Sequence, residues 1–270
     1  DQSSFGIIEV KGPDACSVLN RVCTNQMDRA IGQVIYTCML NERGGVESDL
    51  TAIRLAEDHY RLSVGSTAIK RDLAWLRRHL RTSDAVTLDD VSADFAVLGL
   101  MGPDAAGVAQ AIDASALNEI RYFHAAPVEI TGISAHAARL SYVGEAGWEI
   151  TCRADHAIEL YDVLRRAGAR PAGLFAQTAM RIEKKFLAYG HELDTDLSPL
   201  QTGLGFAVAW ETGFIGKPAL LEQKERDTQN RIVTILLDDK EAVPIGSEPV
   251  IWNGAIVGKT TSAAYGIRVD

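Results

Sequence analysis

Three stretches of this sequence place carboxylates beside aromatic or polar side chains at spacings that could support chemistry. In the first, "GGVESDL", Glu47 and Asp49 follow a pair of glycines at the point where an apolar strand begins. A carboxylate that points inward from the end of a strand can serve as an acid, a base or a charge-orienting group. An acidic flank on a surface hairpin would have the same composition, so this stretch alone leaves both interpretations open.

The second stretch is "LSYVGEAGWEI", residues 140–150, which holds Tyr142, Glu145 and Glu149 around two glycines. Two carboxylates and a phenol inside an otherwise apolar strand need an explanation, because buried polar groups require partners. A surface hairpin would supply one, and a pocket for a flat, nitrogen-rich ligand would supply another.

The third stretch is "AMRIEKKFLAYGHELD", in which Arg181 and Glu183 precede a charged helix end and Tyr189 precedes a glycine. Helix capping with ion pairs between residues four apart would account for this pattern without any ligand. Each of the three stretches is therefore only suggestive when it is considered by itself.

The elements that must position these side chains follow from hydrophobic periodicity and from glycine and proline positions. The segment "NERGG" separates two apolar runs and predicts a tight hairpin in which Gly44 and Gly45 adopt positive φ. Helices are predicted over 67–80, over 155–168 with Gly168 as its stop, and over 174–190 with Gly190 as its stop. Further strands are predicted over 86–91, 127–133 and 135–143.

A strand, then Gly-Pro-Asp-Ala, then a helix occurs twice, in "FGIIEVKGPDACSVLNRVC" and in "FAVLGLMGPDAAGVAQAI". This repeat predicts two related strand–helix units. Because strands and helices mix without the regular alternation of a doubly wound sheet, the fold class is α+β, with antiparallel sheets and flanking helices.

The pattern of apolar and charged residues changes near residue 225. The stretch "KERDTQNR" at 224–231 is expected to be a linker, and 231–237, 248–252 and 255–266 are expected to hold short strands between turns. The predicted division is 1–225 for the larger region and 226–270 for a small β-barrel-like module. The chain begins without Met and stops soon after a strand, so a fragment with a truncated last module is expected.

Composition excludes several classes of protein. Of the 270 residues 47% are hydrophobic and 23% are charged, which is typical of a globular protein. The net charge of −9 argues against a nucleic-acid partner, and no apolar run reaches the roughly 18 residues of a membrane span. Four scattered cysteines argue against a disulfide framework and favour a reducing compartment: the cytoplasm, or the mitochondrial matrix in a eukaryote. The six histidines never pair at metal-ligand spacing, so no metal site is expected, and no dinucleotide fingerprint follows any strand.

Taken in order along the chain, many blocks resemble the tetrahydrofolate-dependent aminomethyltransferase family. This family comprises the glycine-cleavage T-protein and the C-terminal folate domains of dimethylglycine and sarcosine dehydrogenases. The blocks are "DQSSFGIIEVKGPDA", "NRVCTNQMD", "GQVIYTCMLNERGGVESDL", "RDLAWLRRHL", "VLGLMGPDA", "SYVGEAGWEI", "AMRIEKKFLAYGHELD", "SPLQTGLGFAV", "FIGKPAL" and "GKTTSAAYG". Within them, "YTCMLNERGGVESDL" and "EKKFLAYGHEL" are more similar to the flavoprotein dehydrogenases than to the T-protein.

The resemblance implies a three-part fold around a central folate channel. Asp49 matches the family's carboxylate near the reactive folate nitrogens, and Tyr36 falls in the stretch that lines the pocket. Tyr142 and Glu149 match residues that hold the pterin, whose edge presents two neighbouring donors that a carboxylate accepts in a fork. Glu145 is expected to shape the turn.

Two departures from the T-protein pattern affect the assignment. Gln177 stands where T-proteins commonly have Arg, and Ser66 stands where they usually have Asn. Both departures favour the flavoprotein branch, and they place one folate contact in doubt. Gln177 and Arg181 are nevertheless included among the expected folate contacts.

The predicted function is therefore that of a folate domain in a flavin-dependent N-methyl-amine dehydrogenase. A flavin domain upstream, carrying FAD, would oxidise dimethylglycine or sarcosine to an iminium, and this chain would pass the one-carbon unit to tetrahydrofolate. Three alternatives stay open: a stand-alone aminomethyltransferase of glycine cleavage that works with a lipoyl carrier, a folate-dependent demethylase, and a non-catalytic folate-binding module.

Overall fold

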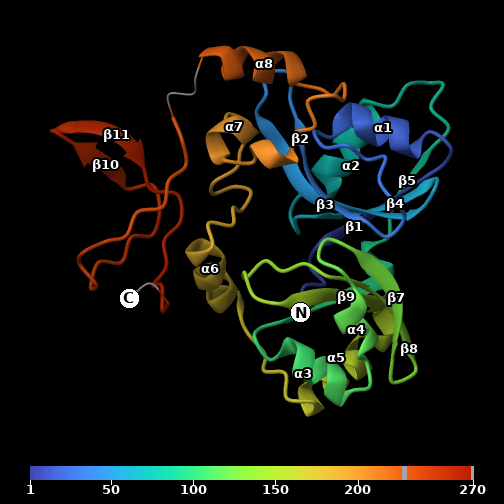
Figure 1. The fold of residues 1–270 in the computed structure, drawn as a ribbon. Coiled ribbons are helices and arrows are strands. Elements are labelled where there is room, and N and C mark those ends of the chain that lie inside the picture. Colours follow the sequence, from blue (N-terminus) through green and yellow to red (C-terminus); the bar gives the residue numbers. More distant parts are fainter. Residues whose placement is uncertain (227–229, 269–270) are drawn as a thin grey trace.

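Two antiparallel sheets with packed helices make up most of the molecule (Figure 1). The computed structural model describes residues 1–226 and 230–268. The first sheet has five strands in the order β2-β3-β4-β1-β5, and the second has four in the order β6-β9-β8-β7. All neighbouring strands in these two sheets run antiparallel, which confirms the predicted mixture of helices and antiparallel sheets.

The first sheet carries the predicted hairpin and its carboxylates. Its strands are β1 (Gly6–Lys11), β2 (Val34–Leu40), β3 (Val46–Ala56), β4 (His59–Val64) and β5 (Thr87–Asp90), and helices α1 (Ala15–Val22) and α2 (Ile69–Arg78) pack on it. Leu50 and Ala52 of β3 join the core on the side of α1 and α2. Successive residues of a strand point to opposite faces, so Asp49 lies on the other face.

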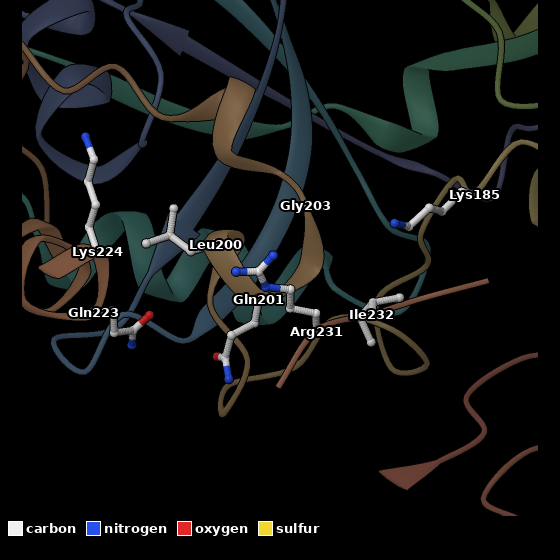
Figure 2. A pocket seen from close by; sticks show the side chains of 8 residues that line it. All are labelled: Lys185, Leu200, Gln201, Gly203, Gln223, Lys224, Arg231 and Ile232. Carbon is white, nitrogen blue, oxygen red and sulfur yellow. The ribbon is translucent and has the colours of Figure 1, made fainter. Parts of the chain in front are cut away.

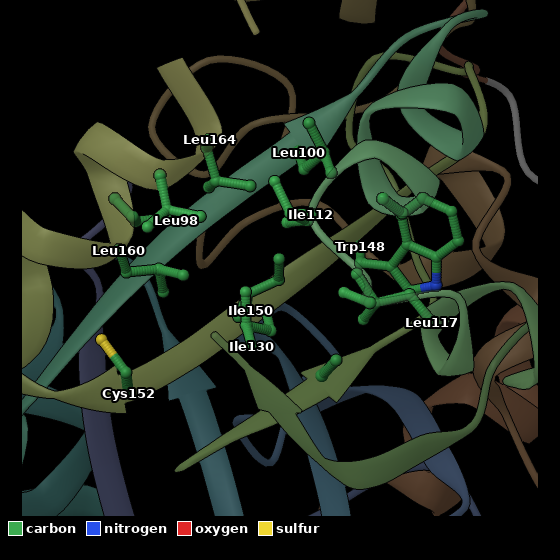
Figure 3. Packing of buried hydrophobic residues seen from close by; sticks show 14 of the residues in the cluster. Leu98, Leu100, Ile112, Leu117, Ile130, Trp148, Ile150, Cys152, Leu160 and Leu164 are labelled. Atoms are coloured by element: carbon green, nitrogen blue, oxygen red, sulfur yellow. The ribbon is translucent and has the colours of Figure 1, made fainter. Parts of the chain in front are cut away.

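The second sheet is also antiparallel and also packs with helices. Its strands are β6 (Phe95–Met101), β7 (Ala125–Ile130), β8 (Ile133–Ala138) and β9 (Gly147–Arg153), and it packs with α3 (Ala105–Ala111), α4 (Ala116–Glu119) and α5 (Ala157–Arg166). Short 3₁₀ turns, η1 (Ser92–Asp94) and η2 (Ala154–His156), flank this sheet. Trp148 and Ile150 of β9 are fully buried in its core (Figure 3). Glu149, between them, faces away from that core.

The two strand–helix units predicted from the repeat are confirmed. In each unit a strand ends at a glycine with positive φ, Gly12 at +134° and Gly102 at +144°. The helix then begins after an aspartate with nearly the same backbone angles, φ −95° at Asp14 and φ −94° at Asp104. Each unit contains the first strand, in chain order, of one of the two sheets, so the repeat in the sequence corresponds to a repeat in the architecture.

The strand predicted over 135–143 is shorter than expected. β8 ends at Ala138, and the chain forms an irregular connection before β9 begins at Gly147. Within this connection the hydroxyl of Ser141 accepts a hydrogen bond from the amide of Val143, and Gly144 adopts φ +69°. Tyr142 and Glu145 therefore lie on a loop, whereas Glu149 lies on a strand.

A third group of elements follows the second sheet. It comprises α6 (Leu174–Glu183), α7 (Pro199–Thr202), the 3₁₀ turn η3 (Gly205–Ala207) and α8 (Lys217–Arg226). Leu200 of α7 and Leu220 of α8 pack with Cys38 on the face of the first sheet that carries Asp49.

The predicted extension of α6 to residue 190 is wrong. Lys185 adopts φ +56°, and the buried Arg181 side chain bonds to the carbonyl of Phe186, so the chain turns back before Gly190.

The C-terminal part forms a two-stranded hairpin, β10 (Pro249–Trp252) and β11 (Ala255–Lys259), which lies apart from the two larger sheets (Figure 1). In the described part of the chain, 231–237 forms no strand and no barrel closes, so the barrel-like module is not confirmed. The predicted linker falls partly in helix α8 and partly in 227–229, which lies outside the described residues. The division at residue 225 stays a prediction.

Two broader expectations can be compared with the structure. No helix in the described ranges combines the length and the apolar character that crossing a membrane requires. All four cysteines carry free thiols.

Candidate functional site

The centre of the candidate site is a hydrogen-bonded pair on neighbouring strands. The phenol of Tyr36 on β2 donates a 2.9 Å hydrogen bond to Oδ2 of Asp49 on β3. Asp49 lies directly opposite Cys38, and Tyr36 lies two residues before Cys38 on the same face of the strand. The pairing register therefore makes Tyr36 and Asp49 diagonal neighbours, within reach of a long aromatic side chain.

The turn before Asp49 is held by the segment that follows α6. Oδ1 of Asn41 accepts hydrogen bonds from the amides of Arg43 and Gly45, and its Nδ2 donates to the carbonyl of Thr195 at 2.9 Å. Of the two glycines, only Gly44 has positive φ, at +86°. A Cβ on Gly45 would lie 1.8 Å from the carbonyl oxygen of Thr195. Glycine is therefore required at position 45 by close packing and not by an unusual backbone conformation. The prediction of positive φ for Gly45 was wrong for this reason.

Electrostatics make Asp49 a better base than a free aspartate. Burial raises the pKa of Asp49, the hydrogen bond from Tyr36 lowers it, and the charge of Asp72 raises it, with a net increase above the ordinary value. Burial and the neighbouring Asp49 carboxylate raise the pKa of Tyr36 well above its ordinary value, so this phenol stays neutral and remains a donor. A carboxylate whose pKa is raised in this way is a stronger proton acceptor than an ordinary aspartate.

Tyr142 joins the loop before β9 to the segment that follows α6. Its hydroxyl donates a 2.6 Å hydrogen bond to the carbonyl of Leu187, and its ring stacks on Phe186 with centroids 6.2 Å apart. Burial raises the pKa of Tyr142 to about 12, and the charge of Asp49 contributes to that rise. Tyr142, which belongs to the second sheet's loop, therefore lies close to the carboxylate of the first sheet.

Glu149 is a half-buried carboxylate with no hydrogen-bond partner in the described part of the chain. It lies in the middle of β9, between Gly99 of β6 and Ala138 of β8. Within residues 1–226 and 230–268, no side chain or amide donates a hydrogen bond to its carboxylate, and burial raises its pKa to about 7. An unsatisfied carboxylate in such surroundings is costly, and a ligand with paired N–H donors would relieve that cost.

Glu145, by contrast, is engaged. Its carboxylate forms an ion pair with Arg268 of the C-terminal segment. The expected role of Glu145 in shaping the turn stays a prediction.

Arg181 is buried and fully engaged by protein groups. It is 4% exposed, and its Nη1 lies 2.7 Å from Oε2 of Glu192, which is also 4% exposed. Nη2 donates to Ser262 at 2.8 Å. Gln177 lies one turn earlier on α6, half-buried, and its side chain makes no hydrogen bond to any described residue. The folate contacts expected of Arg181 and Gln177 stay predictions, and of the two only Gln177 has an uncommitted side chain.

Sequence reasoning missed two aromatic residues beside the site. Phe206, on η3, is 71% exposed and stacks on Tyr36 with centroids 6.0 Å apart and planes 21° from parallel. Phe186 stacks on Tyr142 at 18°. Both residues lie inside blocks of the family resemblance, but nothing in those blocks indicates which ring each would contact.

The predicted residues do not line the cavity shown in Figure 2. That cavity, of about 350 Å³, is bordered by Lys185, Leu200, Gln201, Gly203, Gln223, Lys224, Arg231 and Ile232. Its side chains extend in different directions (Figure 2). The ammonium of Lys224 lies over the ring of Trp210. In the described ranges, no three His, Cys, Asp or Glu side chains are grouped so as to hold a metal ion.

Comparisons with known proteins agree with this architecture. The family model for the GCVT N-terminal domain matches residues 1–212. An aminomethyltransferase of Bacillus cereus (strain AH187) is 36% identical over 270 residues, covering 97% of this chain and 73% of that protein. An aminomethyltransferase of Halalkalibacterium halodurans is 37% identical, with the same coverage of both chains.

A solved structure shows the same fold. The crystal structure of glycine cleavage system aminomethyltransferase T from Bartonella henselae superposes with a TM-score of 0.89 at 26% identity. The match covers 98% of this chain and 73% of that one. Together with the family match, these similarities show that the chain belongs to the GCVT family, alongside the aminomethyltransferases.

Proposed function

We propose that this chain is an aminomethyltransferase that passes a one-carbon unit to tetrahydrofolate, as a stand-alone enzyme of the glycine-cleavage type. Its curated relatives carry the name aminomethyltransferase, and the alignment spans 73% of their length. These relatives are named as transferases and not as flavin-dependent dehydrogenases. The relatives therefore favour the stand-alone enzyme over the flavin-dependent dehydrogenase expected from the sequence.

The observation that carries the proposal is the carboxylate of Glu149, which has no hydrogen-bond partner among the described residues. Glu149 shares a sheet face with Ala138, and Ala138 packs against Val34 on the face of the first sheet that carries Tyr36 and Asp49. The side chain of Glu149 faces away from the core of the second sheet.

Tyr142, seven residues before Glu149, lies close enough to Asp49 for the Asp49 charge to raise the pKa of the phenol. A flat heterocycle with neighbouring N–H donors fits these groups, because Glu149 can accept both donors and the rings of Tyr36 and Phe206 offer apolar faces.

Tetrahydrofolate, when bound, supplies the amine nitrogen that takes up the one-carbon unit. Glu149 and Tyr142 would hold its pterin, with Gln177 as a further contact. Asp49 would orient the reacting nitrogen, stabilise positive charge on it and accept its proton at Oδ1 or Oδ2, while Tyr36 holds the carboxylate in place. Exposed Phe206 would cover the ring and keep water from that proton.

Two assays test the function with the full chain. In the first, a lipoyl carrier protein loaded with an aminomethyl group is mixed with the chain and tetrahydrofolate, and methylenetetrahydrofolate and ammonia are measured. In the second, the carrier is replaced by sarcosine or dimethylglycine together with a flavin dehydrogenase, and formaldehyde is trapped as the uncoupled product.

We expect product in the first assay without any flavin protein. Product only in the second would overturn the stand-alone assignment and restore the dehydrogenase interpretation. Folate binding by calorimetry with no product in either assay would indicate a non-catalytic folate-binding module.

A further inference from the structure

A second carboxylate, Asp72, is buried behind the strand that carries Asp49. Asp72 lies in the first turn of α2 and is 1% exposed. Its Oδ2 accepts a 2.6 Å hydrogen bond from the hydroxyl of Ser48, the residue that precedes Asp49 on β3. Because adjacent strand residues point to opposite faces, this bond attaches β3 to the helix directly behind Asp49.

The other oxygen of Asp72 contacts a partly exposed cation. Nε of Arg71 lies 3.2 Å from Oδ1 of Asp72, and its guanidinium lies over the ring of Tyr189 at 4.2 Å. The Arg71 side chain is 40% exposed, so solvent screens much of its charge. Two carboxylates, Asp49 and Asp72, therefore share one partly screened cation.

The surroundings of both carboxylates are defined. The charged or titratable groups that influence Asp49 come from β2, the loop before β9, and α2, and they are Tyr36, Cys38, Tyr142, Arg71 and Asp72. Those that influence Asp72 are Asp49, Arg71, Glu47, Cys23 and Tyr189, with the Ser48 hydroxyl as its hydrogen-bond donor.

An acidic residue in the first turn of a helix is common, because it complements the helix dipole. Asp72 differs from that ordinary case. A side chain there usually remains in solvent or caps backbone amides, whereas both oxygens of Asp72 bond to side chains and almost none of its surface reaches solvent. Burying a carboxylate is costly, so its retention needs a benefit elsewhere.

We infer that Asp72 is a positioning residue, which fixes the strand under Asp49 through Ser48 and whose buried negative charge strengthens Asp49 as a proton acceptor. This inference rests on the proposed function only in giving Asp49 a proton to accept. Since Asp72 is inaccessible, it acts through Asp49 rather than by touching a ligand.

The test uses Asp72→Asn, which keeps the size of the side chain and an oxygen that can accept from Ser48 but removes the charge. The readout is a ¹³C NMR titration of the Asp49 carboxyl carbon in the ligand-free full chain, assigned with Asp49→Asn. The matched control is Asp104→Asn, the same change at an exposed aspartate beside α3 of the second sheet.

We expect the Asp49 midpoint to fall by roughly one pH unit in Asp72→Asn and to stay unchanged in Asp104→Asn, because a like charge disfavours ionisation. The acid limb of product formation should move by the same amount, with folate affinity within about twofold of the parent. An unchanged midpoint in a folded Asp72→Asn protein would leave Asp72 a purely structural residue and overturn the inference. A large loss of folate affinity would overturn it too, by placing Asp72 in ligand binding.

A second variant keeps the test decisive if Asp72→Asn does not fold. Ser48→Ala leaves both carboxylates in place but removes the hydroxyl that joins β3 to Asp72, so product formation should fall severalfold with folate affinity within about twofold of the parent, and unchanged product formation would contradict the positioning role. Failure of the proposed function is distinguishable, since the parent chain would then form no product in either assay, while the Asp49 midpoints of the parent and of Asp72→Asn would still report the coupling.

Discussion

The phenol of Tyr36 donates a 2.9 Å hydrogen bond to Asp49 from the neighbouring strand, and the ring of the same tyrosine stacks on the exposed Phe206. One residue thus holds the proposed proton acceptor through its hydroxyl and offers an apolar face through its ring. The two roles can be separated, because Tyr36→Phe keeps the ring and removes the donor.

In Tyr36→Phe, the pKa of Asp49 should rise, because the hydrogen bond from Tyr36 stabilises the ionised carboxylate and the variant lacks that bond. Asp49 would then remain protonated to higher pH, and the acid limb of product formation should move upward. The free energy of unfolding should fall by about 1 kcal/mol. A pH series of product formation, with chemical denaturation beside it, measures both, and an acid limb that stays in place would show that the pair has no electrostatic role.

Asp49→Asn should separate chemistry from binding. Asn has a similar shape but cannot accept the proton or stabilise positive charge, so product formation should fall about 100- to 10,000-fold. Folate affinity, measured by calorimetry, should change little because the pterin is held elsewhere. Glu47→Gln is the control, since Glu47 lies two residues earlier on the same strand. Normal product formation in Asp49→Asn would favour a passive folate-binding module.

Glu149→Gln should weaken binding and yet stabilise the ligand-free protein. The side chain of the variant would have one acceptor oxygen instead of two for the paired N–H donors of the pterin. The free energy of folate binding should therefore weaken by about 2–4 kcal/mol, or roughly 30- to 1000-fold in affinity. Calorimetry measures this loss. Equal affinity in variant and parent would leave Glu149 as an ordinary strand residue.

The stability effect of Glu149→Gln has a defined pH window. The folded-state pKa of Glu149, about 7, lies above its ordinary value of 4.5, so folding favours the neutral form. That contribution is complete below pH 4.5 and is lost as pH rises through 7. The variant should therefore match the parent near pH 4.5 and be more stable by about 1–3 kcal/mol at pH 8. Denaturation curves that coincide at both pH values would contradict the burial of this carboxylate.

Arg181→Met should destabilise the chain by about 3–5 kcal/mol, because it leaves Glu192 buried without its cation. The double variant Arg181→Met with Glu192→Leu should recover much of that loss. If the double variant folds and still binds folate with the parent's affinity, Arg181 has a structural role only. A folded double variant with greatly reduced affinity would support the predicted folate contact.

Gly45→Ala should lower the free energy of unfolding by about 2–4 kcal/mol and reduce product formation, because the new methyl group would clash with the Thr195 carbonyl and shift the start of β3. Gly213→Ala is the control, since no atom lies within 4 Å of the Cβ position there. Thermal melting of both variants measures the difference, and equal melting temperatures would show that the turn adapts to a side chain.

Local patterns in the sequence determined much of the architecture. The repeated strand–Gly-Pro-Asp-Ala–helix unit, the hairpin before Asp49 and the helix that stops near Gly168 were all predicted, because each depends on a few neighbouring residues and on backbone angles that glycine permits. The placement of Asp49 just inside a strand followed from the same local signals.

Other features were decided only by tertiary structure. Helix α6 ends at Glu183 because Arg181 bonds to Glu192 and to the Phe186 carbonyl, and periodicity cannot foresee a buried ion pair. The stacking of Phe206 on Tyr36 joins residues 170 positions apart in the chain. Whether a carboxylate is paired depends on every segment that folds around it, which is why only the folded chain distinguishes unpaired Glu149 from engaged Glu145.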